Sequence, residues 1–73
     1  MDTFKIRAYS KKELALMYFP MANSPHAAVN HLMSWVRRCA PLWDELQRMG
    51  YVKTSKYFTS REVARIVYYI GEP

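Results

Sequence analysis

The hydrophobic and polar positions of this 73-residue chain repeat mainly with the period of an α-helix. The longest pattern covers Ser24 to Cys39, where Ser24 suits the N-cap and Pro25 the first helical position, which needs no amide donor. At about 100° per residue the side chains divide into an apolar and a polar side. We expect the apolar side to form the main wall of the core, with Trp35 as its largest side chain. It contains Ala28, Val29, Leu32, Met33, Trp35, Val36 and Cys39.

The polar side of this helix carries no carboxylate. It contains His26, Ala27, Asn30, His31, Ser34, Arg37 and Arg38. Most solvent-facing helix surfaces mix the two charge signs, whereas this one offers only neutral and positive groups. Such a surface suits a polyanionic partner, although a solvated basic face explains it equally well.

A second helix is predicted over Lys11–Phe19. Ser10 and Glu13 match a capping box, in which the serine accepts from an amide and the glutamate reaches back, and Pro20 ends the helix. After Glu13 every residue is apolar. A helix without a polar face usually lies at the centre of a core or is covered by a partner, so we expect one of these two places for it.

Two further helices follow. One runs from Pro41 to Met49 and ends at Gly50, which suits the left-handed position after a helix. The last begins with a capping box from Thr59 to Glu62 and is closed by Gly71. Its outward ridge is expected to consist of Arg61, Arg65 and Tyr69.

Near the start of the chain, Thr3–Tyr9 alternates with the period of a strand, and Phe4, Ile6 and Ala8 are expected to face inward. Its only candidate partner is Tyr51–Tyr57, so we expect a two-stranded ribbon at most, or an extended arm. The predicted fold is therefore mainly α: a compact single domain over residues 1–73, with four helices and a short N-terminal β-strand.

Composition narrows the class of protein. A hydrophobic content of 51% with only two glycines is not that of a disordered tail. The single cysteine cannot form an internal disulfide, and no run of 18 apolar residues suggests a membrane span. We expect a cytoplasmic protein that does not bind a membrane.

The spacing of the histidines, the cysteine, the carboxylates and the glycines does not match that of a known catalytic or metal-binding motif. His26 and His31 lie about 140° apart around their helix, so they cannot share a metal, and Cys39 faces the opposite side. No two carboxylates are placed to bracket a substrate, and Gly50 and Gly71 alone cannot build a phosphate loop. We predict a non-enzymatic protein with no cofactor, no metal and no small-molecule substrate.

Nucleic acid remains the sharpest hypothesis, because the chain has a net charge of +5 and a pI near 9.6. The start of the Lys11–Phe19 helix also resembles that of excisionase-like and winged-helix regulators. The loop before Ser24, however, is longer than a helix-turn-helix turn and lacks glycine. The expected DNA contacts are Asn30, Ser34, Arg37 and Arg38, supported on phosphates by Lys11, Lys12, Arg61 and Arg65.

A protein-interaction or oligomerisation module is the alternative. The chain holds six tyrosines, two tryptophans and five methionines, which are residue types that favour interfaces. Equally, so small a domain needs most of its aromatic side chains for its own core.

Several segments together resemble a small family of uncharacterised domains from Bacteroides-type gut bacteria. They span nearly the whole chain: Phe4-Lys-Ile-Arg-Ala-Tyr, Lys12-Glu-Leu-Ala, Tyr18-Phe-Pro, Ser24-Pro, Leu32 with Trp35 before Arg38-Cys39, Gly50-Tyr51, Lys56-Tyr-Phe-Thr, Val63 with Ile66, and Gly71-Glu-Pro. The resemblance implies family membership but assigns no activity, cofactor or site residue.

Overall fold

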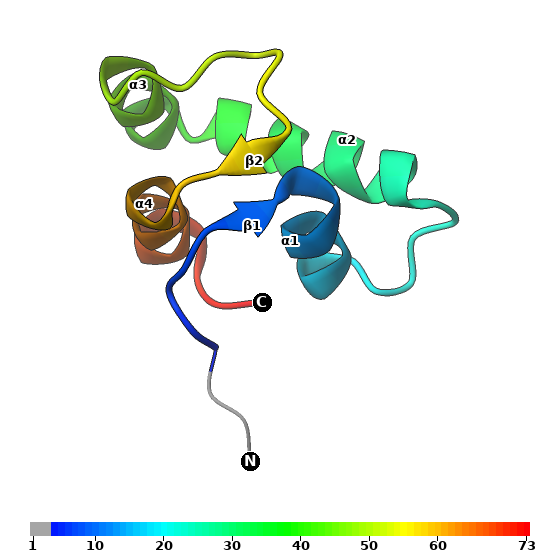
Figure 1. The fold of residues 1–73 in the computed structure, drawn as a ribbon. Coiled ribbons are helices and arrows are strands. Elements are labelled where there is room, and N and C mark those ends of the chain that lie inside the picture. The colour runs from blue at the N-terminus through cyan, green and yellow to red at the C-terminus, as the bar shows by residue number, and fades with distance from the viewer. Residues whose placement is uncertain (1–3) are drawn as a thin grey trace.

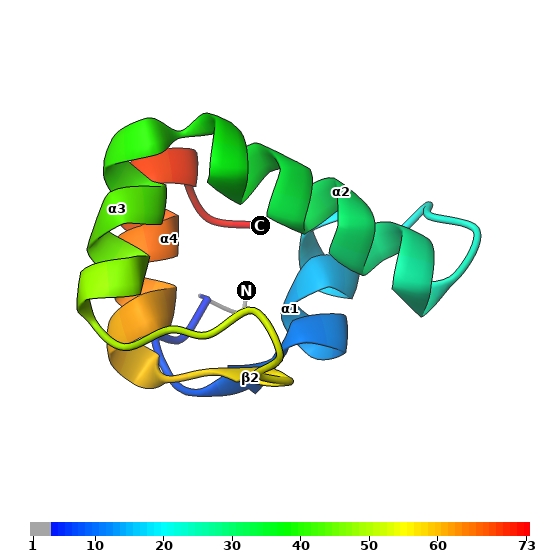
Figure 2. The same cartoon turned by 90° about the horizontal axis from the view of Figure 1, so that it is seen from above.

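The computed structural model describes residues 4–73, and these form four helices and one pair of short strands (Figure 1). In chain order the elements are β1 (Tyr9–Ser10), α1 (Lys11–Tyr18), α2 (Pro25–Arg38), α3 (Ala40–Arg48), β2 (Tyr57–Phe58) and α4 (Ser60–Ile70). Helix α1 packs on α2, while α3 and α4 pack against each other beyond the other end of α2 (Figure 2). The predicted four-helix fold with a short N-terminal strand is confirmed.

The helix starts follow from local chemistry. The hydroxyl of Ser24 accepts from the amide of Ala27 at 3.1 Å, which confirms the predicted N-cap of α2. At α4 both halves of the capping box are present: Thr59 accepts from the amide of Glu62 at 3.2 Å, and the Glu62 carboxylate accepts from the amide of Thr59 at 2.8 Å. Both starts were predictable because each partner lies within three residues.

The start of α1 keeps only half of its predicted capping box. Ser10 accepts from the amide of Glu13 at 3.0 Å, as expected. The carboxylate of Glu13 instead accepts from the guanidinium of Arg7 at 3.1 Å. An arginine six residues earlier in the chain therefore takes the place that the capping box assigns to a backbone amide.

The inward side of the N-terminal strand was predicted wrongly for three of its residues. Only Tyr9–Ser10 pairs with β2, antiparallel, and Tyr9, predicted to face outward, is buried opposite Phe58. Ile6 is 48% exposed and Ala8 is also exposed, whereas Phe4 packs half-buried against the core, as predicted. The reason is that pairing with β2 determines which side chains of this segment are buried, and the pairing places Tyr9 next to the buried Phe58. The predicted strand began at Thr3, which lies outside the described residues.

Helix α1 is not buried all round. Leu14 and Ala15 are fully buried, whereas Leu16 and Met17 are exposed on the opposite side. Helix α1 has only about two turns, and α2 and the β-ribbon cover one part of its surface. The apolar side chains on the rest of α1 therefore face solvent. The expectation of a central helix thus holds for one side of α1.

Trp35 does not form part of the core, contrary to the prediction. Its side chain is 45% exposed, while Leu32 and Val36 of the same helix are fully buried. Trp35 lies at the edge of the apolar side, about 100° around the helix from Val36. There the ring of Phe19 packs against it, with ring centroids 4.7 Å apart in an edge-to-face arrangement.

The core is instead centred on the β-ribbon and the inner sides of all four helices. Phe58 is its largest fully buried side chain and stacks on Tyr51, with ring centroids 5.5 Å apart. The other buried apolar residues are Tyr9, Leu14, Ala15, Ala28, Leu32, Met33, Val36, Leu42, Leu46, Val63 and Ile66. In the described chain, no helix has the length and apolar character to cross a bilayer.

Candidate nucleic-acid interface

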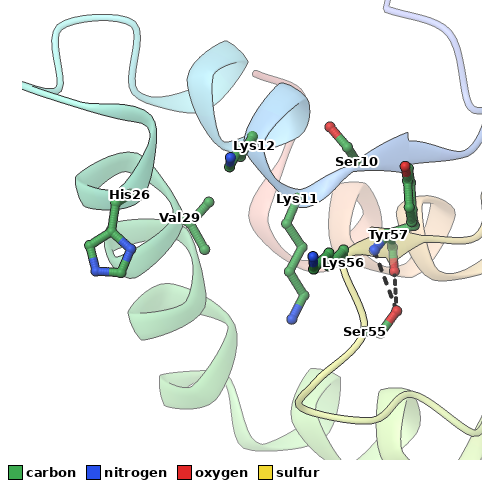
Figure 3. A pocket seen from close by; sticks show the side chains of 8 residues that line it. All are labelled: Ser10, Lys11, Lys12, His26, Val29, Ser55, Lys56 and Tyr57. Carbon is green, nitrogen blue, oxygen red and sulfur yellow. Dashed lines mark hydrogen bonds between the residues drawn. The ribbon is translucent and has the colours of Figure 1, made fainter.

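A basic groove lies where the first turn of α1, the first turns of α2 and the segment leading into β2 meet (Figure 3). Its volume is about 350 Å³. It is lined by Ser10, Lys11, Lys12, His26, Val29, Ser55, Lys56 and Tyr57. None of these eight residues carries a carboxylate, and three of them are lysines, which make the groove positive.

Strand pairing brings these distant segments together. The amide of Lys11 donates to the carbonyl of Lys56 at 2.9 Å, next to the two residue pairs of the ribbon. The Ser55 hydroxyl donates to the carbonyl of Tyr57 at 2.9 Å and holds the approach to β2. Figure 3 shows His26 projecting from α2 on one side of the groove and Lys56 from the β2 segment on the other.

The Lys11 side chain is held in place by two contacts. Its ammonium donates to the carbonyl of Lys53 at 3.2 Å and lies 4.9 Å from the centroid of the Tyr51 ring. Burial, and next the positive charge of Arg37, lower the pKa of Lys11, against the opposing effect of Glu62. The lowered pKa of Lys11 therefore reflects chiefly the burial of its side chain, and the positive charge of Arg37 adds to the effect.

The carboxylate that acts on the pKa of Lys11 is already engaged in a helix cap. Glu62 is buried, and its carboxylate accepts from the amide of Thr59 in the capping box of α4. It influences the pKa of Lys11 from beneath the surface without lining the groove. The surface of the groove therefore stays positive.

The four α2 residues predicted to contact DNA divide into two pairs. Asn30 and Arg37 lie within about 40° of His26 around the helix, on the flank that borders the groove. Ser34 and Arg38 lie about 80–120° from His26 and turn away from it. Neither pair lines the groove itself. The structure thus brings Lys11 and Lys12 together with Arg37 close by, and leaves Arg38 apart.

The predicted outward ridge of α4 is wrong for Arg65 and Tyr69, because both contact α3. The guanidinium of Arg65 forms an ion pair with Glu45 at 2.8 Å, and the Tyr69 hydroxyl donates to the same carboxylate. Arg65 also lies over the Tyr68 ring, 4.5 Å from its centroid. Arg61 remains exposed, but it lines a separate hollow beside Arg48, Met49, Thr59 and Ser60.

The Glu45 contacts make the stability of the protein depend on pH. The hydrogen bond from Tyr69 and then that from Arg65 lower the pKa of Glu45. Because the folded-state pKa lies below the unfolded value of about 4.3, the stabilisation is complete above that value and is lost as the pH falls through the folded-state pKa. We expect wild type to exceed Glu45→Gln in urea midpoint at pH 7, and this difference to shrink towards about pH 3.

Asp44→Asn is the matched control, because Asp44 is an exposed carboxylate on the same helix and pairs with Arg48 at the surface. Surface pairs of this kind contribute little, so its urea midpoint should stay close to that of wild type at both pH values. A difference between wild type and Glu45→Gln that is the same at both pH values would contradict this account.

Sequence reasoning did not assign Lys56, His26 or Tyr57 to the site. Lys56 and Tyr57 reach the groove only through the pairing of β1 with β2, which no local pattern specifies. The available signal was the position of Lys56 directly before two aromatic residues, Tyr57 and Phe58. Among residues 4–73, no three His, Cys, Asp or Glu side chains gather where they could hold a metal ion.

The fold and groove define a small, mainly helical domain with a basic surface recess. The family model described as a domain of unknown function, DUF4248, matches residues 5–73, and the chain belongs to this family. The predicted membership of an uncharacterised domain family is thus confirmed. No curated protein and no solved structure matches the chain.

Proposed function

We propose that this protein is a non-enzymatic, nucleic-acid-associated domain that binds phosphates along the basic groove. One observation carries the proposal: Lys11, Lys12 and Lys56 converge from two distant segments on a recess whose lining contains no carboxylate. Lysine ammonium groups are common phosphate contacts, and their positive field attracts a polyanion before contact. His26 adds donor capacity at the rim.

The proposal assigns different roles to the predicted contact residues. Lys12 and Lys56 contact phosphates directly, while Lys11, anchored to Lys53, sets the potential of the groove. Asn30 and Arg37 extend the contact along the flank of α2.

The remaining predicted contacts lie further from the groove. Arg38, Ser34 and Arg61 contribute only if the nucleic acid continues beyond it. Arg65 contributes least, because its charge is paired with Glu45.

Binding to nucleic acid as a function of salt tests the proposal. Fluorescence anisotropy with a labelled 20-base-pair random duplex and a labelled 20-nucleotide single strand should detect binding to at least one of them at low salt. With about three phosphate contacts, log K should fall against log salt with a slope of about −2 to −3. Absence of binding to both, or an affinity indifferent to salt, would overturn the proposal.

A protein-interaction module is the second candidate, supported by the exposed Trp35 and Phe19 pair. A half-exposed tryptophan backed by a second aromatic ring is typical of interface anchors. Sedimentation at several concentrations separates the candidates: self-association that Trp35→Ala abolishes favours the module, and a strict monomer favours the nucleic-acid proposal.

A cytoplasmic location in a Bacteroides-type bacterium completes the proposal. The location is supported by the single cysteine, which suits a reducing compartment, and by the abundance of nucleic acid there.

A further inference from the structure

The ring of Tyr57 is the most unusual feature of the groove. Its side chain is 65% exposed, although the next residue, Phe58, is fully buried. Within residues 4–73, no aromatic ring and no cation lies over the Tyr57 ring. Tyr68, another exposed tyrosine, is by contrast covered by Arg65 and contacts the ring of Tyr69. Tyr57 therefore offers an uncovered aromatic surface directly beside the lysines (Figure 3).

The size of the groove limits what can enter it. A volume of about 350 Å³ is at the lower end of small-ligand pockets, which range over about 300–1,000 Å³. An unstacked base fits such a recess, whereas a duplex has no free base to place in it. The groove is also a recess between elements, not a projecting helix of the kind that reads the major groove.

The arrangement of groups matches the two parts of a single strand. The Tyr57 ring provides an aromatic face for a base at one end of the groove, while Lys12 and Lys56 provide cations for the neighbouring phosphates. Proteins that bind single strands without sequence preference combine these two features, because every base has a π-face that can stack on an aromatic ring.

We propose that the groove binds single-stranded nucleic acid, with one base stacked on Tyr57 and the neighbouring phosphates held by Lys12 and Lys56. This inference rests on the proposed function, because it names the class of nucleic acid that the same site binds. It implies that sequence preference is weak and that binding depends on the aromatic ring rather than on the tyrosine hydroxyl.

The test compares oligo(dT) of 20 nucleotides with a 20-base-pair duplex at one salt concentration, using wild type and three variants. Wild type should bind oligo(dT) more tightly than duplex. Tyr57→Ala should weaken oligo(dT) binding about tenfold, within the range for loss of one stacked base, whereas Tyr57→Phe should keep it. Tyr68→Ala is the matched control, because it removes an exposed tyrosine outside the groove, and should bind as wild type does.

Each outcome decides a separate question. Duplex binding as tight as oligo(dT) binding, or Tyr57→Ala binding oligo(dT) like wild type, overturns the single-strand inference and leaves the proposed function intact. Failure of wild type to bind either nucleic acid overturns the proposed function itself.

Two further measurements do not depend on the binding of the variants. Circular dichroism of Tyr57→Ala shows whether this variant is folded. Ultraviolet crosslinking of wild type to oligo(dT), mapped by mass spectrometry, locates the bound base without any substitution. A crosslink at Tyr57 supports the inference, and crosslinks only at other residues contradict it.

Discussion

Replacing Phe58 with alanine should lower the free energy of unfolding by about 3–5 kcal/mol, as expected for a buried aromatic residue. Phe58 is fully buried, stacks on Tyr51 and pairs with Tyr9 across the ribbon. Removing its ring leaves a cavity where the ribbon meets the helices. Since a domain of this size has a total stability of only about 5–10 kcal/mol, the variant is expected to be close to unfolding at 25 °C.

Urea unfolding followed by circular dichroism measures this effect, and two further variants keep the result interpretable. Phe58→Leu retains most of the buried volume and should remain folded, with a loss clearly smaller than that of alanine. Tyr57→Ala changes the adjacent, exposed aromatic residue and should shift stability by no more than about 0.5 kcal/mol. Equal losses for Phe58→Ala and Tyr57→Ala would contradict the placement of the core.

Reversing two charges in the groove should have the largest effect on binding. The double variant Lys12→Glu/Lys56→Glu replaces two phosphate contacts with two repulsive carboxylates. Each phosphate contact to a single strand contributes about 0.7 to the salt slope, so the slope should decrease by about 1.4 and the affinity near 0.1 M salt should fall roughly 30-fold or more. Both side chains are exposed, so the fold should be retained.

The control is Lys5→Glu/Arg48→Glu, which changes the net charge of the protein by the same amount. Lys5 and Arg48 are exposed, neither lines the groove, and neither is a proposed contact. If binding depends on the groove, this control should retain most of the affinity of wild type. An equal loss in both double variants would indicate attraction by net charge alone, without a defined site.

The helices were predictable because their signals are local. Ser24 and Pro25 identify the start of α2, and Thr59 and Glu62 identify that of α4, through bonds that span three residues. Burial was less predictable. Trp35 has the hydrophobicity of a core residue, but it lies at the edge of the apolar side of α2, where its burial depends on what packs beside that helix.

The candidate site divides in the same way. Lys11 and Lys12 were predicted as phosphate contacts from the positive charge of the chain. Lys56 and Tyr57 were not, because their position depends on the pairing of two strands that are far apart in the chain. The predicted role of Arg65 depends on its neighbours too, since Glu45 belongs to a different helix.

By itself, the sequence determined the number and approximate limits of the helices, their caps and the positive charge of the protein, because these depend on composition and on contacts within one or two turns. Only the tertiary structure decided which apolar residues are buried and which lysines and arginines lie close together. Strand pairing between β1 and β2 places Lys56 and Tyr57 beside Lys11 and Lys12, and helix packing neutralises Arg65 and leaves Trp35 at the surface. Both outcomes depend on contacts between distant segments, which no local pattern specifies.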